Sequence, residues 1–211
     1  EGFTDNIAGL LQSSRDIYFS AASFDFSATF FRPRGLDNAN GKVLINGLEM
    51  NKLLNGRPQW SNWGGLNDLQ RNQVFTSGVN PSENTFGDIA GTNSISMRAS
   101  AYSEGGRISY AFANRSYLGR VMASYSSGIS KKGWSYAVLA SRRFGNEGYI
   151  EGTLYDSNSF FAAVEKQLGD NHSITFNFIY AQNRRGRSTA LTNEIYELKG
   201  RQYNPFWGEI D

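Results

Sequence analysis

The second half of the chain alternates apolar with polar or small residues, and this pattern restricts the fold more than any other feature. In the clearest segment, residues 173–182, four large apolar side chains occupy every second position. A period of two indicates a β-strand whose two faces meet different surroundings. The segments with this alternation are residues 107–114, 120–128, 134–141, 159–168 and 173–182.

The connections between these segments alternate between short and long. Residues 130–133 and 169–172 are tight turns, whereas residues 145–158 and those from 183 onward form long loops. Short turns at one end and long loops at the other are typical of outer-membrane β-barrels. The strand lengths suit a tilted crossing of about 9–11 residues. A soluble meander with one buried face gives the same alternation, so the pattern alone leaves both open.

Composition excludes several classes. The 211 residues carry a net charge of +2, which gives no electrostatic footprint for nucleic acid. The chain has no cysteine, so a disulfide framework and a thiolate metal site are excluded. The single histidine, His172, lies in a predicted turn without a partner for base or metal chemistry. We therefore expect neither an enzyme nor a cofactor.

The first half is predicted to be a small α+β unit. Apolar residues spaced three and four apart predict a helix over residues 6–14, and a helical turn is expected at residues 66–71. Residues 42–50 form a buried strand that runs into Asn46-Gly47, a pair suited to a tight hairpin turn. Residues 73–76 and 94–98 are further short strands, and the second belongs to a joint at residues 86–99.

Several motifs resemble those of one family in their order along the chain. The segment from Val43 to Met50 resembles the strand and turn of the plug domain in TonB-dependent outer-membrane transporters. The segment from Phe31 to Gly35 resembles the Arg-Gly element before it, and residues 74–98 are similar to the last plug segment. The segments at residues 63–68, 147–153 and 203–208 look like the variants found in transporters of the Bacteroidota.

This resemblance implies a plug domain over residues 1–103, followed by antiparallel transmembrane β-barrel strands over residues 104–211. The whole barrel would have about 22 strands. It implies active import of a scarce nutrient across the bacterial outer membrane, energised by the partner protein TonB with its inner-membrane complex. The tight turns would be periplasmic and the long loops extracellular. By family analogy alone, a surface lipoprotein lid is a further candidate partner, besides the outer-membrane lipids.

A count of strands adds a constraint. About five or six strands fit between residue 105 and the end, whereas membrane barrels start at eight. Open edges in lipid leave unpaired backbone groups, so we expect further strands from the same barrel or from another chain. No segment before Ile7 resembles a TonB-binding box. Two alternatives therefore stay open: a non-transporting plugged barrel that serves as a structural subunit, and a soluble β-rich binding module. The substrate is not specified.

Two groups of residues are candidate site residues. Trp60, Asn62 and Trp63 lie on a predicted plug loop that would face outward, where tryptophan offers a flat surface and one N–H donor to a ligand. The same tryptophans can instead wedge the plug against the barrel wall. Four arginines are expected to pair with acidic or carbonyl groups between plug and barrel, because buried charges need partners. They are Arg32, Arg34, Arg71 and Arg98.

Overall fold

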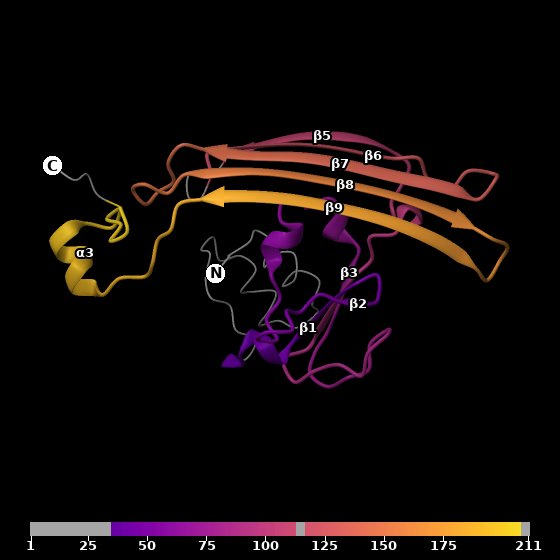
Figure 1. The fold of residues 1–211 in the computed structure, drawn as a ribbon, viewed down its shortest axis with the longest axis horizontal. Helices are drawn as coiled ribbons and strands as arrows, with labels where there is room; N and C mark the ends of the chain where they lie inside the picture. The colour runs from indigo at the N-terminus through magenta and orange to yellow at the C-terminus, as the bar shows by residue number, and fades with distance from the viewer. Residues whose placement is uncertain (1–34, 113–116, 208–211) are drawn as a thin grey trace.

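The computed structural model describes residues 35–112 and 117–207, and in this part the protein is mostly β with two sheets and one α-helix (Figure 1). Neither sheet is closed; the strand orders are β2-β1-β4-β3 and β5-β6-β7-β8-β9. The chain passes from the first sheet to the second between Ile95 and Gly105. The helix predicted over residues 6–14 lies outside the described residues.

The first sheet belongs to what we call the N-terminal unit, described from residue 35 to residue 103. Its strands are β1 (Lys42–Ile45), β2 (Leu48–Glu49), β3 (Gln73–Thr76) and β4 (Thr92–Ile95). The β1 and β4 strands are parallel, and the other two pairings are antiparallel. The predicted strand at residues 73–76 is confirmed, whereas the one expected at residues 94–98 begins and ends earlier.

The helical segments described in the N-terminal unit are single 3-10 turns. They are η2 (Asn38–Asn40), η3 (Trp60–Trp63), η4 (Leu69–Arg71) and η5 (Ala99–Ala101). The helical turn expected at residues 66–71 is η4. The apolar residues of these segments do not recur with helical spacing over the length that an α-helix needs. The segments therefore end after one turn.

The predicted Asn46-Gly47 turn joins β1 to β2 and is confirmed. Both residues have positive φ, 50° at Asn46 and 85° at Gly47, as a two-residue hairpin turn requires. The Asn46 side chain also accepts a hydrogen bond from the backbone N–H of Met97 at 2.7 Å, and its backbone N–H donates to Ile95 at 3.0 Å. The turn therefore fixes the end of β4 as well as its own hairpin.

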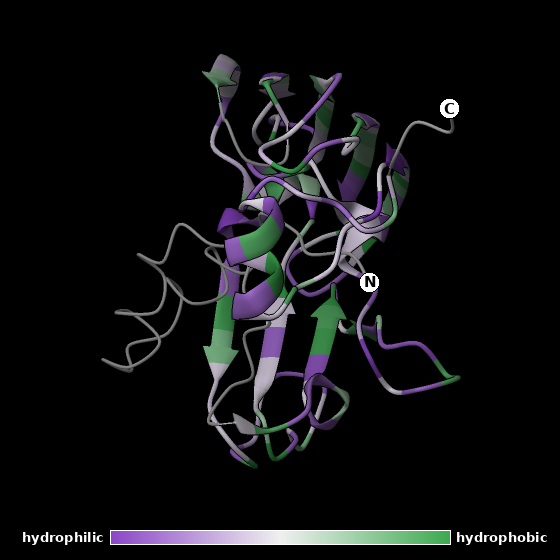
Figure 2. Ribbon diagram, turned by 90° about the vertical axis from the view of Figure 1, so that its left-hand side faces the viewer, coloured by the Kyte–Doolittle hydropathy of each residue, from purple (hydrophilic) through white to green (hydrophobic). Residues whose placement is uncertain are grey.

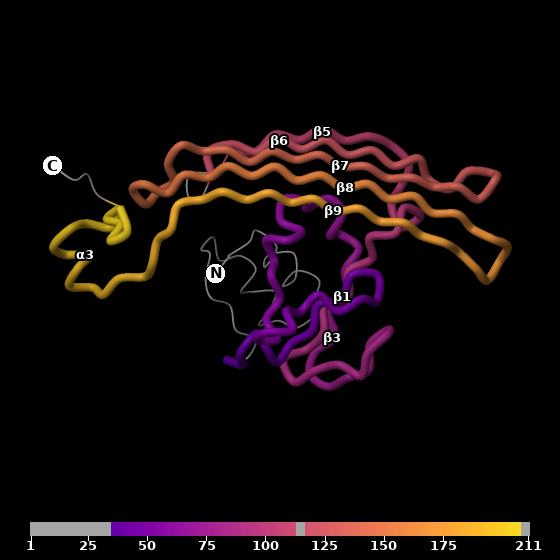
Figure 3. The backbone as a smooth tube through the Cα atoms, viewed as in Figure 1, coloured from indigo at the N-terminus to yellow at the C-terminus, as the bar shows by residue number. Residues whose placement is uncertain are grey.

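The second sheet is an antiparallel meander of the five predicted strands. It consists of β5 (Gly105–Phe112), β6 (Gly119–Ser126), β7 (Trp134–Gly145), β8 (Tyr155–Gln167) and β9 (Ser173–Arg185). The last three run longer than predicted, so the loop between β7 and β8 shrinks to residues 146–154. The strands run side by side and curve over the N-terminal unit, with the short turns at one end and the long loops at the other (Figure 3).

The α-helix α3 (Asn193–Lys199) lies in the loop after β9, where the sequence analysis expected no structure. Its signals are weak but present: Thr192 at the N-cap position, Glu194 in the first turn, and Ile195 and Leu198 three residues apart. The hydrogen bond that Glu194 receives from the Thr192 hydroxyl lowers the pKa of this glutamate. None of the described helices has the length and apolarity needed to span a membrane.

The two faces of the second sheet differ in residue size and in exposure. The inner face, turned toward the N-terminal unit, carries small or polar residues with a few large apolar ones, and most of them are buried on β7 and β8. The outer face carries large apolar side chains that remain exposed, for example Ile108 at 83% and Phe176 at 67%. Viewed from the end that carries α3, the sheet forms an arc above the N-terminal unit (Figure 2).

The main core lies between the two sheets. Trp63, Leu66 and Met97 of the N-terminal unit pack against the inner face at Leu139 and Phe161, and all five side chains are at most 1% exposed. The core is therefore shared: the N-terminal unit and the inner face bury each other's apolar residues.

The Asn46 contacts generate a prediction about the N-terminal unit. Asn46→Ala removes the acceptor of the Met97 N–H. It also places alanine, which adopts positive φ less readily than asparagine, at a position that requires it, so it should destabilise this region by about 2 kcal/mol. Hydrogen exchange at the Met97 amide of the intact protein should become faster. Asn46→Asp keeps the acceptor and the tolerance of positive φ, and should exchange like the native protein. Equal exchange in all three proteins would show that the turn does not hold β4.

Candidate functional site

The candidate site is the interface between the N-terminal unit and the inner face of the second sheet. Three parts of the N-terminal unit contact the strands: η3, the segment around η4, and η5. Each brings polar groups as well as apolar ones. Polar contacts carry geometric specificity because their partners must meet at defined positions.

The contact at η5 is an ion pair across the two sheets. Arg98, just before η5, donates to the carboxylate of Glu165, which is buried on the inner face of β8. The second carboxylate oxygen accepts from the Ser100 hydroxyl at 2.7 Å and from the Ser100 backbone N–H at 3.1 Å. Arg98 also donates to the Ser173 hydroxyl on β9 at 2.8 Å. Glu165 is thus fully partnered by one short segment of the N-terminal unit.

The second contact centres on Asp68, next to η4. Its carboxylate lies 3.4 Å from Arg107 on β5 and accepts from the Ser124 hydroxyl on β6 at 3.3 Å. It also pairs with Arg71 at 3.0 Å, three residues along the chain. Asp68 therefore attaches the N-terminal unit to the first two strands of the second sheet, whereas Glu165 attaches it to the fourth.

The third contact joins η3 to β8 and β9. The Ser159 hydroxyl donates to the Gly64 carbonyl at 2.6 Å, and the Asn183 side-chain amide donates to the Ser61 carbonyl at 3.0 Å. Gly65 has φ of 85°, and a Cβ there would lie 2.8 Å from the Ser159 hydroxyl. Glycine is required at this position both for the backbone conformation and for the close approach.

Tyr102 closes the end of the N-terminal unit against β6. Its hydroxyl donates to the Leu69 carbonyl at 3.1 Å, and its carbonyl accepts from the Ser126 hydroxyl at 3.5 Å. Burial raises the pKa of Tyr102 well above its usual range because the charged phenolate would be poorly solvated. The hydroxyl therefore remains a donor to the Leu69 carbonyl even at pH values where an exposed tyrosine would ionise.

The three predicted ligand-binding residues are placed differently from one another. Together they form η3, but Trp63 is completely buried in the shared core and has no surface to offer a ligand. Asn62 is exposed and Trp60 is half-buried. The two tryptophan rings pack edge to face at 5.6 Å. Trp63 thus packs against the second sheet, as in the alternative to ligand binding given above.

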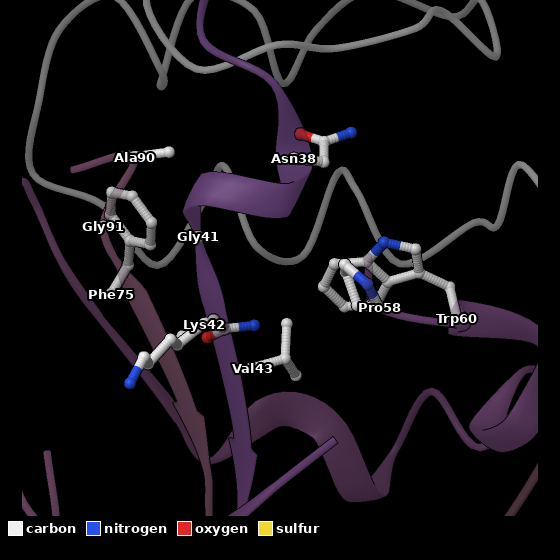
Figure 4. A pocket seen from close by; sticks show the side chains of 10 residues that line it. Asn38, Gly41, Lys42, Val43, Pro58, Trp60, Phe75, Ala90 and Gly91 are labelled. Carbon is white, nitrogen blue, oxygen red and sulfur yellow. The ribbon is translucent and has the colours of Figure 1, made fainter. Parts of the chain in front are cut away.

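Trp60 also lines a mainly apolar pocket in the N-terminal unit (Figure 4). Phe75 and Pro58 contribute apolar surface to the same pocket, and the buried residue Asn93 also lines it. This pocket lies beside β1 and β4 and reaches η3 through Trp60.

The predicted arginines divide into three cases. Arg32 and Arg34 lie outside the described residues. Arg71 is exposed and pairs within the N-terminal unit, but the Asp68 carboxylate that it touches also contacts β5. Arg98 is the one of the four that, within the described part of the chain, pairs directly with a strand of the second sheet.

Arg143 is an interface residue that the sequence analysis did not select. It is buried on the inner face of β7, lies over the Tyr155 ring at 5.2 Å, and donates to the Ser157 hydroxyl and the Asn183 side chain. Extending the period of two beyond residue 141 places Arg143 on the same face as Leu139 and Ser141. That extension was the signal that would have identified it.

Comparisons with protein-family models, with curated proteins and with solved structures gave no match.

We expect the two partners of the Arg98–Glu165 pair to differ in how much stability their substitution costs. Arg98→Ala leaves a buried carboxylate with only Ser100 as donor, so it should destabilise the docking by about 2 kcal/mol, allowing for the partial exposure of Arg98. Glu165→Gln keeps an acceptor for Ser100 without a charge and should lower stability by only about 1 kcal/mol. The free energy of unfolding of the intact protein measures both.

The matched control is Arg71→Ala, which removes an exposed arginine from Asp68; because Asp68 keeps Arg107 and Ser124 as partners, stability should change by less than about 0.5 kcal/mol. The double variant Arg98→Ala/Glu165→Gln should lose less than the sum of the single changes, because the two groups interact. Additive losses would contradict the pairing.

Proposed function

We propose that this chain is the plug and the first barrel strands of a TonB-dependent outer-membrane transporter. In this proposal the N-terminal unit is the plug, the five-stranded sheet is the opening part of the barrel wall, and further strands complete the barrel. The plug closes the barrel until TonB, acting from the periplasm, moves part of it so that a scarce nutrient passes. The outer membrane of a bacterium is then its location.

The observation that carries the proposal is the inverted polarity of the second sheet. In a soluble meander the large apolar residues form the core, yet here those residues are the exposed ones. A sheet that is apolar outside and more polar inside suits a barrel in lipid. The exposed apolar side chains of this outer face are Ile108, Tyr110, Phe112, Val121, Tyr125, Trp134, Tyr136, Val138, Phe160, Val164, Ile174, Phe176, Phe178 and Tyr180.

The outer face also has a boundary. The continuous apolar rows of β7, β8 and β9 end with Ala140, Phe160 and Tyr180, which are register neighbours, and Phe144 is the one outward apolar residue of these strands beyond that level. The next outward row, two residues further toward the long loops, consists of Arg142, Asn158 and Gln182. A change from apolar to polar on the outer face of three neighbouring strands suits the edge of a hydrocarbon layer.

The apolar band crosses the strands obliquely. On β5 the outward apolar residues centre on Tyr110. Tyr110 lies level with Val121 on β6, and Val121 lies level with Arg142 on β7. On β7 itself the band centres between Tyr136 and Val138, and on β9 at the same level. The shift of about five residues is not spread evenly over the four strand spacings, so it defines no single tilt angle. All of the shift arises between β5 and β7.

The polar contacts of the interface suit a plug that must move. Ion pairs and hydrogen bonds such as those of Glu165 and Asp68 fix the closed position, yet they exchange for contacts with water when the surfaces separate. A purely apolar interface of the same size would oppose separation more strongly. The substrate class is not specified by these contacts.

The lipid-facing role of the outer face is testable with two arginine substitutions on one strand. Phe178→Arg places a charge in the middle of the apolar band and should destabilise the protein in phospholipid vesicles by about 2–4 kcal/mol. Gln182→Arg makes a similar change in the polar row of the same strand and should be nearly neutral. Both side chains face outward, so a water-exposed face would tolerate both.

The measurement is the free energy of unfolding from vesicles, with folding yield as a second readout. Equal tolerance of Phe178→Arg and Gln182→Arg would reject the membrane proposal. A protein that stays soluble without detergent while both variants fold would favour the soluble binding module.

The plug role predicts a gating phenotype that requires no knowledge of the substrate. In planar bilayers the intact protein should be closed, and Arg98→Ala should increase the frequency of channel openings because it weakens the closed position. Arg71→Ala should behave like the native protein. If Arg98→Ala inserts normally and stays as closed as the native protein, this ion pair does not hold a gate.

A further inference from the structure

Three lysines lie at the short-turn end of the second sheet. Lys131 and Lys132 lie in the turn between β6 and β7, and Lys166 lies near the end of β8. Lys166 and Trp134 are register partners on neighbouring strands, and the Lys166 ammonium lies 5.2 Å from the centre of the Trp134 ring. The same ammonium donates to the Lys132 carbonyl oxygen. The contacts of Lys166 therefore join the turn, β7 and β8 at one place.

The turn that carries Lys131 and Lys132 is held firmly. The Ser130 N–H donates to the Trp134 carbonyl at 2.8 Å, and the Trp134 N–H donates to the Ser130 hydroxyl at 3.0 Å. Gly133 has φ of 74°, and a Cβ there would lie 3.1 Å from the Gln167 carbonyl oxygen. The backbone that presents the lysines is thus fixed against β8, which lowers the entropy lost when a ligand binds.

The charge at this end is not matched by neighbouring carboxylates on the outer face. Lys131 and Lys132 are exposed and, within the described residues, make no ion pair. Two carboxylates lie at this end: Glu104 flanks the start of the same turn, next to Gly128, and Asp170 lies in the neighbouring turn between β8 and β9. The opposite end differs, because there Arg142 pairs with Asp156 at 3.3 Å.

The lysines directly border the apolar band. Trp134 is the first residue of its outward row, followed by Tyr136, and Val164 lies beside Tyr136 on β8. An anion held by the ammonium groups would therefore sit at the edge of the apolar surface. Ammonium groups next to an aromatic ring at such an edge are suited to the phosphate of a lipid whose acyl chains lie along the band.

We propose that Lys131, Lys132 and Lys166, with Trp134, form a binding site for the headgroup of an anionic glycerophospholipid in the leaflet at the short-turn end. This inference rests on the proposed membrane function, which places that leaflet on the periplasmic side. The site would favour anionic over zwitterionic phospholipid by charge, since the three ammonium groups outnumber the two carboxylates at this end, Glu104 and Asp170.

The test is native mass spectrometry of the intact protein in detergent, titrated separately with phosphatidylglycerol and phosphatidylcholine of the same acyl chains. Phosphatidylglycerol should bind more tightly. Lys131→Gln/Lys132→Gln should reduce this preference by about fivefold for each lysine removed. Lys166→Arg keeps the charge and should retain most of it. The control is Arg142→Gln, which removes an outward cation at the opposite end and should leave the preference unchanged.

Equal binding of the two lipids by the native protein would overturn the site, and so would a preference that the double lysine variant retains. A loss in Arg142→Gln as large as in the double variant would place anionic lipid at the other end and also overturn it. These failures are distinguishable from failure of the proposed function, because the comparison of Phe178→Arg with Gln182→Arg tests membrane insertion without reference to lipid charge.

Discussion

The rest of the structure depends on the contact between the N-terminal unit and the inner face of the second sheet. Inner-face positions on β7 and β8 carry small residues such as Ser135, Ala137 and Ala163, so the backbone of η3 and η5 can approach closely. The large residues that remain there, Leu139 and Phe161, meet Trp63 and Met97. Because this contact buries the apolar residues of both partners, it supplies the shared core.

That contact also leaves the opposite face of the sheet without a covering. Successive side chains of a strand point to opposite faces of the sheet. Since the inner-face positions carry mostly small or polar residues, the large apolar residues between them point outward. An exposed apolar surface of this extent is unusual for a water-soluble chain and requires a partner of its own. Lipid is the partner that we propose, and the polar row after Ala140, Phe160 and Tyr180 together with the lysines near Trp134 would be its two boundaries.

Polar attachment of the N-terminal unit is distributed rather than concentrated. Asp68 reaches the first two strands, Glu165 receives Arg98 and Ser100 on the fourth, and the η3 carbonyls are held from β8 and β9. Each contact is limited in strength, from about 1 kcal/mol for a hydrogen bond to about 2 kcal/mol for removal of the half-exposed Arg98 from the buried Glu165. In the proposed transporter, such a set allows part of the plug to be released while the remainder stays attached.

The sequence by itself determined the five strands, the Asn46-Gly47 turn and the alternation of short and long connections, because these depend on local periodicity and turn chemistry. It also predicted a charged partner for Arg98, and the structure pairs Arg98 with Glu165. Only the tertiary structure decided which face of the sheet is covered, that Trp63 is buried rather than available to a ligand, and that Arg71 pairs locally. Those outcomes depend on which segments meet across the fold, as Glu165 and Arg98 do over 67 residues of chain, and no local pattern encodes such distant pairings.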